Sequence, residues 1–350
     1  MATARDVSPQ WRVPLLLFGF LCLVAGIFGG LARSGLGGWA ILSPAVALHG
    51  VLMVCGFFGT VISLERAAAL GQRWAYAGPL ACGVGGIALL SGATLVGLWL
   101  LAAGAGILVA ASLVFVWRRP SLDIGALAVA AGCWFVGNVL LALGASLFAV
   151  LGWWIAFFAL TIGAERLELS RYMPRPRAAH WLFAGTALAL VAGALGSPLL
   201  TGSALLALAA WLCAFDLARK TIFGTGLARY IAACLLAGYA WLALGGALLV
   251  AGAAHDTAVH ALLVGFVFSM VFGHAPVIVP AVLRRALPYT PWLYAPLALL
   301  HVSLALRAAG GLAGDLPLRT AGSIGNALAI ALFIAMAAAQ TLRRPAGRNP

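Results

Sequence analysis

Long apolar runs, separated by short polar or basic segments, dominate the pattern of hydrophobic and polar positions along the chain. A helix needs about 20 mostly apolar residues to cross a bilayer. The pattern therefore predicts an all-α polytopic membrane protein, a single membrane domain over residues 1–350 with about twelve transmembrane helices. The expected spans are 14–32, 41–63, 74–92, 94–117, 122–143, 145–163, 180–196, 199–217, 229–251, 257–282, 291–309 and 319–341.

The distribution of basic residues gives these spans an orientation. If the N-terminus is placed in the cytoplasm, 18 basic residues fall in inside segments, and only Arg33, Arg307 and Arg319 fall outside. Cytoplasmic loops of membrane proteins carry an excess of Lys and Arg. We therefore expect the N-terminus and the C-terminus to be cytoplasmic.

Composition agrees with this class, since 64% of the 350 residues are hydrophobic and only 8% are charged, which excludes an ordinary soluble domain. The formal net charge of +13 comes almost entirely from arginines in short loops, so it reflects topology and does not indicate nucleic-acid binding. The six cysteines lie in apolar runs and form no CxxC pair, as expected of reduced packing residues. The expected partners are membrane lipid and a small-molecule ligand, and the oligomeric state is left open.

The second span carries a narrow polar stripe. His49, Met53, Gly56, Thr60 and Ser63 follow one another at steps of four and three, which places them on one helix face. Such a stripe on an otherwise apolar helix points into a bundle and away from lipid.

Four histidines fall inside predicted spans. The second and tenth spans run in the same direction, so His49 and His260 should lie at similar depth in the outer half of the membrane, with His301 also nearer the outside. His274 should lie roughly 21 Å along its helix from His260, too far to share a metal ion. Imidazoles from different helices can hold a haem iron, so His49, His260 and His301 form the candidate cofactor site and His274 is a separate candidate metal ligand. The alternative reading, in which each histidine only bonds across the bundle, stays open.

Two Glu-Arg pairs end spans of the predicted bundle. Glu65-Arg66 follows the second span and Glu165-Arg166 follows the sixth, and we expect ion pairs there at the cytoplasmic helix ends. The spans with similar features, the second, sixth and tenth, are four apart. This spacing is compatible with three repeats of four helices in a pseudo-threefold arrangement.

Two histidine segments carry a resemblance to known families. The sequence from His49 to Phe57 resembles the second helix of haem-copper oxidase subunit I, and Phe272–Pro280 is similar to the copper-ligand segment of that superfamily. The closer resemblance is to the NnrS family of haem- and copper-containing membrane proteins with twelve spans. It rests on His49, Met53, Gly56 and Phe57, and on a later segment with His260, Ala261, Leu262 and Gly265.

The resemblance implies a protein of the bacterial inner (cytoplasmic) membrane, linked to nitric oxide or respiratory redox metabolism. It implies haem b as cofactor, with copper as a second metal near His274. The chain has no adjacent pair of histidines, so the three-histidine copper site of the oxidases cannot form.

Two other function classes remain open. A small-solute transporter would use Pro276 and Pro280, which are expected to bend or break the tenth span and free backbone carbonyls. A non-catalytic membrane assembly subunit would need no cofactor. Whether the protein is an enzyme stays open.

Overall fold

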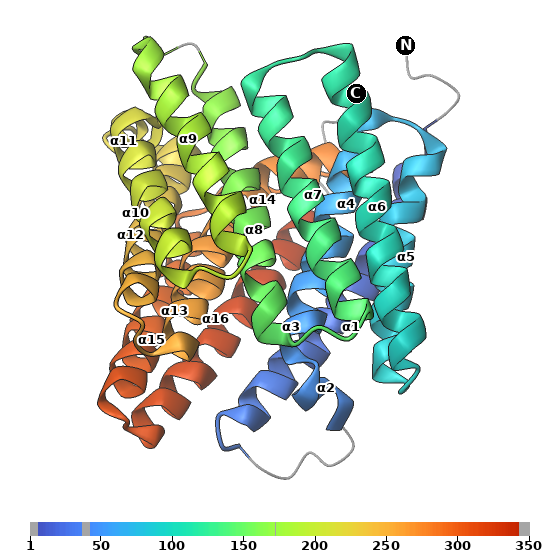
Figure 1. Cartoon of the computed structure of the whole chain (residues 1–350), viewed down its shortest axis with the longest axis vertical. Helices are drawn as coiled ribbons and strands as arrows, with labels where there is room; N and C mark the ends of the chain where they lie inside the picture. The colour runs from blue at the N-terminus through green and yellow to red at the C-terminus, as the bar shows by residue number, and fades with distance from the viewer. Residues whose placement is uncertain (1–5, 37–42, 172, 343–350) are drawn as a thin grey trace, which may run out of the picture.

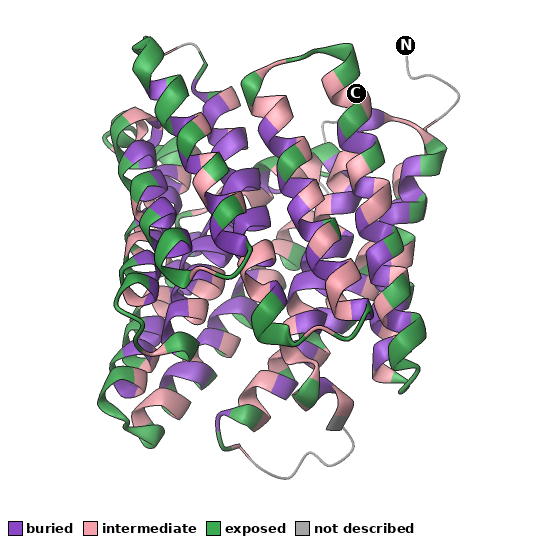
Figure 2. Cartoon of the chain, in the orientation of Figure 1, coloured by how far each residue is buried: buried purple, intermediate pink, exposed green. Residues whose placement is uncertain are grey.

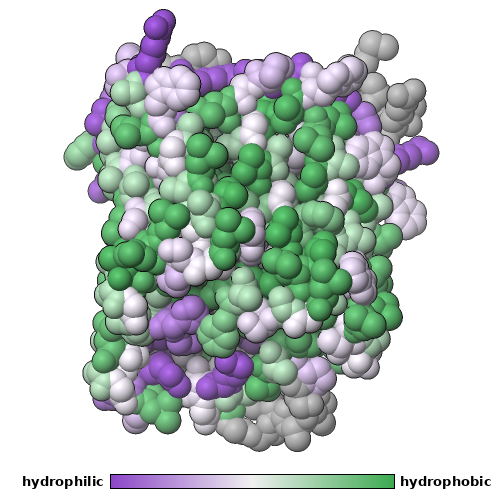
Figure 3. Space-filling view, in the orientation of Figure 1, coloured by the Kyte–Doolittle hydropathy of each residue, from purple (hydrophilic) through white to green (hydrophobic). Residues whose placement is uncertain are grey.

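The computed structural model describes residues 6–36, 43–171 and 173–342. All regular secondary structure in these ranges is helical. The long helices run side by side in alternating directions and form one bundle (Figure 1). Hydrophobic side chains cover the middle of the visible face, and hydrophilic ones gather toward its two ends (Figure 3). This is the surface of a multi-pass membrane protein, with an apolar belt between polar ends.

In the described ranges, ten helices are long and apolar enough to cross a membrane, which confirms the polytopic helical class. Three of the ten are composite, because short π-helical or 3₁₀ pieces continue directly into α-helices. The ten are α1 (Pro9–Arg33), α3–η2–α4 (His49–Val51, Leu52–Phe58, Gly59–Leu70), α6 (Thr94–Arg118), α7 (Leu122–Ala142), α8 (Leu147–Leu169), α10 (Pro198–Phe215), α12 (Gly226–Val250), α13–η4–α14 (His255–His260, Ala261–Phe268, Ser269–Leu283), η5–α15 (Pro291–Leu293, Tyr294–Ala313) and α16 (Leu316–Leu342).

The two other predicted spans coincide with less typical helices. The span 74–92 corresponds to η3 (Arg73–Tyr76) and α5 (Ala77–Leu90), whose 14 residues fall short of a bilayer. The span 180–196 corresponds to α9 (Arg177–Ala194), which has Arg177 and His180 in its first turn. The short helices α2 (Ser43–Ala47) and α11 (Ala218–Thr221) complete the fold. Residues 41–42 of the second predicted span and both chain ends lie outside the described residues.

The predicted tight turns are present. Gly92 separates α5 from α6 with φ +88°, and Gly144 separates α7 from α8 with φ +95°. Only glycine adopts this left-handed region without steric cost, so these two residues allow the chain to reverse within a few residues. The first helix begins earlier than predicted, because Arg12 is buried there and donates to Asp6 and to the carbonyl of Val282.

Three spans form the centre of the bundle. Over an apolar stretch of 18 residues in each helix, the share of buried residues is 72% in His49–Leu70, 67% in α8 and 61% in His255–Leu283, against 28% in α1 and 33% in α16. Figure 2 shows buried residues concentrated at the helix contacts. The three spans meet through Phe58, whose ring contacts Phe158 at 5.0 Å and Phe268 at 5.1 Å between centroids. The helix does not break at Pro276 and Pro280, because α14 stays helical through both residues.

Candidate functional site

The structure brings His49 and His260 together. His49 is the first residue of α3 and His260 is the last residue of α13, on two of the three central spans. Their ring centroids lie 6.3 Å apart and their planes differ by 13°. The two side chains predicted to share a depth in the membrane therefore face each other with nearly parallel rings.

Backbone carbonyls set the tautomer of both rings. Nδ1 of His49 lies 2.6 Å from the Gly26 carbonyl oxygen, and Nδ1 of His260 lies 2.7 Å from that of Asp256. A carbonyl only accepts, so each neutral ring carries its proton on Nδ1 and keeps a lone pair on Nε2. Metal-ligating histidines use this arrangement, in which the other ring nitrogen donates to a carbonyl.

Glycines of α1 let the His49 ring reach this position. A Cβ added at Gly30 would lie 2.7 Å from Cε1 of His49, and one added at Gly26 would lie 2.7 Å from Sδ of Met53. Both approaches are closer than real Cβ contacts allow. The polar stripe of the second span therefore packs on a glycine face of α1. Sequence reasoning missed this face, although the spacing of four between Gly26 and Gly30 was a usable signal.

Each histidine of the pair is followed by a π-helical segment. The π-helix η2 begins three residues after His49, and η4 begins directly after His260. Such segments are rare and are frequently found at functional sites. Below the pair, the two segments contribute Phe57 and Phe268, whose rings stack at 6.1 Å with planes 10° apart.

Arginine surrounds the pair on its polar side. The Arg307 guanidinium donates to Nε2 of His260 at 2.9 Å and to Ser323 Oγ at 3.0 Å, and it lies 3.4 Å from a carboxylate oxygen of Asp256. The charges of Arg33 and Arg319 also act on this group. The charge of Arg33 thus acts on His49, and those of Arg307 and Arg319 act on Asp256, which adjoins His260.

His301 does not join this pair. The indole Nε1 of Trp241 donates to Nδ1 of His301 at 2.9 Å, and the two rings stack with planes 12° apart. An indole only donates, so the neutral ring carries its proton on Nε2, 3.4 Å from Ser269 Oγ. The Ser269 hydroxyl itself donates to the Cys234 carbonyl and can accept this proton. Both nitrogens of His301 therefore have partners in the bundle.

His274 stands apart from the pair, as its position along the helix predicts. Its Nδ1 lies 2.7 Å from the Met270 carbonyl oxygen, so Nε2 keeps the lone pair. This Nε2 is buried and has no hydrogen-bond partner within the described part of the chain. In that same part, no group of three or more His, Cys, Asp or Glu residues could hold a metal ion.

Comparison with known proteins gives one family. The family described as "Domain of unknown function (DUF8744)" matches residues 12–342. The chain belongs to this family. No curated protein and no solved structure matches the chain.

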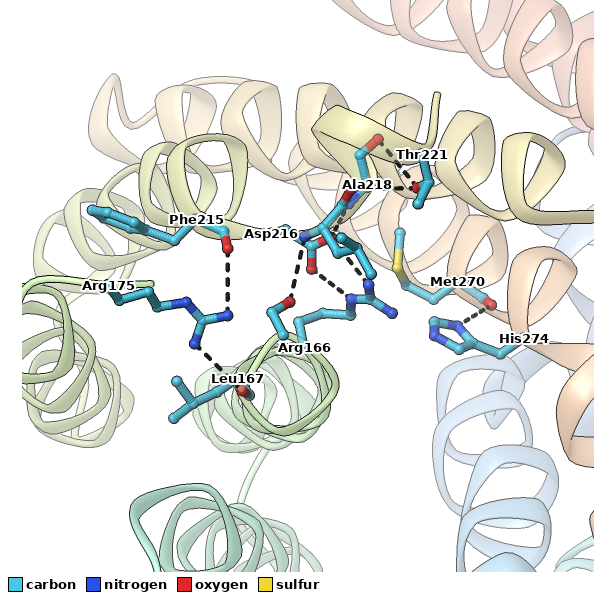
Figure 4. Close-up of polar contacts among 11 residues, drawn as sticks. Arg166, Leu167, Arg175, Phe215, Asp216, Ala218, Thr221, Met270 and His274 are labelled. Carbon is cyan, nitrogen blue, oxygen red and sulfur yellow. Dashed lines mark hydrogen bonds and ion pairs between the residues drawn. The ribbon is translucent and has the colours of Figure 1, made fainter. Parts of the chain in front are cut away.

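A second polar cluster in this DUF8744 protein gathers residues of α8, of α14 and of the segment before α11 (Figure 4). Arg166 and Asp216 form a buried two-point ion pair, with N–O distances of 2.6 and 3.0 Å. His274 lies beside this pair, which supplies the charges that act on its ring. The Tyr239 hydroxyl is also buried and lies near Asp216.

The ion pair predicted between Glu165 and Arg166 is corrected by this geometry. Successive residues on a helix point about 100° apart. The Arg166 side chain therefore pairs with Asp216, whereas the Glu165 side chain lies near that of Glu65. Within the described contacts, no Glu65–Arg66 ion pair forms either, and the Arg66 guanidinium lies over the Phe115 ring at 5.3 Å.

Proposed function

We propose that this protein binds haem b, which His49 and His260 would hold through their Nε2 atoms. The observation that carries the proposal is the near-parallel pair of rings at 6.3 Å, each with its Nδ1 proton directed to a backbone carbonyl. Histidine nitrogens bind metals at about 2.0–2.1 Å, so a metal between two imidazoles separates the ring centres by roughly 6 to 6.5 Å. Two imidazoles at this spacing, each with its proton on Nδ1, are a donor set that would suit a haem iron.

The charges around the pair also fit a porphyrin. Haem carries two propionate carboxylates, and Arg33, Arg307 and Arg319 supply cationic groups close to the histidines. Arg307 now donates to Nε2 of His260, so this nitrogen becomes available only when the guanidinium turns away. Ser323 and Asp256 bind the same guanidinium and would retain it beside the pair after it leaves Nε2.

When bound, such a haem would supply one-electron chemistry, and a small ligand such as nitric oxide would bind only in place of one of the two histidines. The residues of this chain orient the two imidazoles and fix their tautomers. We include copper at His274 only as a second metal. The lone pair on Nε2 of His274 has no hydrogen-bond partner among the described residues. We propose a role in nitric oxide or respiratory redox metabolism, with catalysis left open.

The proposed setting is a bacterial inner membrane crossed twelve times, with both termini in the cytoplasm. Supporting this, the second, sixth and tenth spans are the three most buried of the ten apolar helices. They meet at Phe58, Phe158 and Phe268. A centre made of every fourth helix is what three repeats of four helices would produce. The transporter alternative required a break in the tenth span, whereas α14 is continuous through Pro276 and Pro280.

Visible spectroscopy of the purified full-length protein tests the proposal. We expect a Soret band that shifts on reduction, and its loss or displacement in both His49→Ala and His260→Ala. Imidazole added to His49→Ala should restore the band, which separates a missing ligand from a misfolded chain. His301→Gln is the matched control, because both nitrogens of His301 are already used. A colourless wild-type protein, or a band that survives both alanine variants unchanged, refutes the assignment.

A further inference from the structure

A cavity of about 400 Å³ opens where α12 and η5–α15 begin. Its wall combines one arginine, two tyrosines and the residues around the first turn of α12, and it contains no acidic residue. The lining residues are Ile222, Thr225, Gly226, Arg229, Ala233, Tyr289 and Tyr294. The cavity lies far in sequence from His49 and is independent of the haem proposal.

The charge of this cavity is uncompensated. Arg229 is exposed and makes no hydrogen bond or ion pair within the described part of the chain, and its charge acts on Tyr294. The sequence from 217 to 255 and from 257 to 314 contains no Asp or Glu. The nearest acidic residue in sequence, Asp216, is already paired with Arg166. An anion in the cavity would therefore meet Arg229 without a competing carboxylate.

One helix N-terminus adds to this positive potential. Gly226 is the first residue of the 25-residue α12. The cap residue of α12, Thr225, makes no side-chain capping bond, and the helix has no acidic residue in its first turn. Unpaired amides and the helix dipole at such ends attract phosphate groups.

The tyrosines complete a headgroup-sized recess. Tyr230 is buried between them, with its ring centroid 5.2 Å from that of Tyr294 and 6.2 Å from that of Tyr289. Packing against Tyr230 holds the two lining rings in place, and Arg229 lines the same cavity.

We infer that this cavity is a binding site for the phosphate group of an anionic phospholipid such as phosphatidylglycerol. Arg229 would pair with the phosphate, Tyr289 and Tyr294 would donate to its oxygens, and the acyl chains would continue along the apolar belt. Basic pockets between transmembrane helices on the cytoplasmic side bind anionic headgroups in this way. On the proposed topology, this end of α12 is the cytoplasmic one.

Native mass spectrometry of the purified full-length protein, titrated with phosphatidylglycerol or phosphatidylcholine, tests the site. We expect wild-type protein to bind one phosphatidylglycerol in preference to phosphatidylcholine. Arg229→Gln should weaken that binding about fivefold, the equivalent of about 1 kcal/mol per arginine. Tyr289→Phe combined with Tyr294→Phe keeps the ring packing and should weaken it as well. Arg118→Gln is the matched control, since Arg118 is an equally exposed arginine at a helix end outside the cavity.

A second arm distinguishes the source of the phosphate. Thermal unfolding is followed in sodium phosphate and in sodium chloride of equal ionic strength, for wild type and for Arg229→Gln. Stabilisation by inorganic phosphate that needs Arg229, without a preference for phosphatidylglycerol, supports the same site with free phosphate as its ligand. If Arg229→Gln and Arg118→Gln respond identically to lipid and to phosphate, the inference is overturned.

Discussion

The buried ion pair between Arg166 and Asp216 allows a sharp stability prediction. The side chain of Asp216 is 0% exposed and that of Arg166 is 6% exposed. Asp216 accepts two bonds from the guanidinium and a third from the Ala218 amide. In Asp216→Ala, the arginine charge stays buried without a partner, so we expect the free energy of unfolding to fall by about 3–5 kcal/mol.

Two further variants separate the charge from the packing. Asp216→Asn keeps hydrogen-bond acceptors but removes the negative charge, so its loss of stability should be intermediate. The double variant Arg166→Met with Asp216→Leu removes both charges and should recover most of the stability, because replacing both members of a buried pair is often neutral. Glu168→Gln is the control, since the contact of Glu168 with Arg171 spans 4.0 Å between side chains that are 41% and 43% exposed. It should cost less than about 1 kcal/mol.

The assay is equilibrium unfolding of the purified protein in mixed micelles, with increasing denaturing detergent and helix content followed by circular dichroism. The free energy differences are compared at the same detergent composition. A loss below 1 kcal/mol in Asp216→Ala, or a double variant as unstable as the single one, would contradict the reasoning. Either result would mean that the pair is hydrated in the membrane protein and contributes little.

Two further predictions follow from close packing in the described bundle. Gly30→Ala should destabilise the protein by about 1–3 kcal/mol, because the added Cβ meets the His49 ring at 2.7 Å. Gly125→Ala is the control in the same unfolding assay. It should be neutral or slightly stabilising, because a Cβ at Gly125 meets nothing within 4 Å. Asn138→Leu should lower the free energy of unfolding by about 1–3 kcal/mol, because the Trp154 indole that donates to Asn138 at 3.0 Å loses its partner. Red-edge fluorescence should report the changed environment of Trp154. Equal stability of wild type and Asn138→Leu would argue against a role for this bond.

The sequence was informative wherever one physical requirement dominates. Crossing a bilayer demands long apolar runs, so helix positions could be predicted, including the turns at Gly92 and Gly144. Depth follows from helix direction and residue position, so the juxtaposition of His49 and His260 could be anticipated from topology alone.

The sequence was uninformative where the partner of a residue lies far away along the chain. Arg166 stands beside Glu165, yet its partner Asp216 comes 50 residues later, and no local pattern marks such a pair. The same holds for Trp241 and His301, which are 60 residues apart. Arg307 did carry a signal, since it was one of three arginines that opposed the expected charge distribution.

The choice among the intramembrane histidines depends on such distant partners, because an imidazole can bind a metal only through a nitrogen that keeps its lone pair. His301 fails this test, since the Trp241 indole occupies Nδ1 and the proton occupies Nε2. His274 passes it, but stands alone in the described part of the chain. His49 and His260 pass it and face each other at a spacing that two metal–nitrogen bonds would produce. The proposed cofactor site therefore consists of this pair. Arg307 bonds to Nε2 of His260, so a metal bound at that nitrogen must displace the guanidinium.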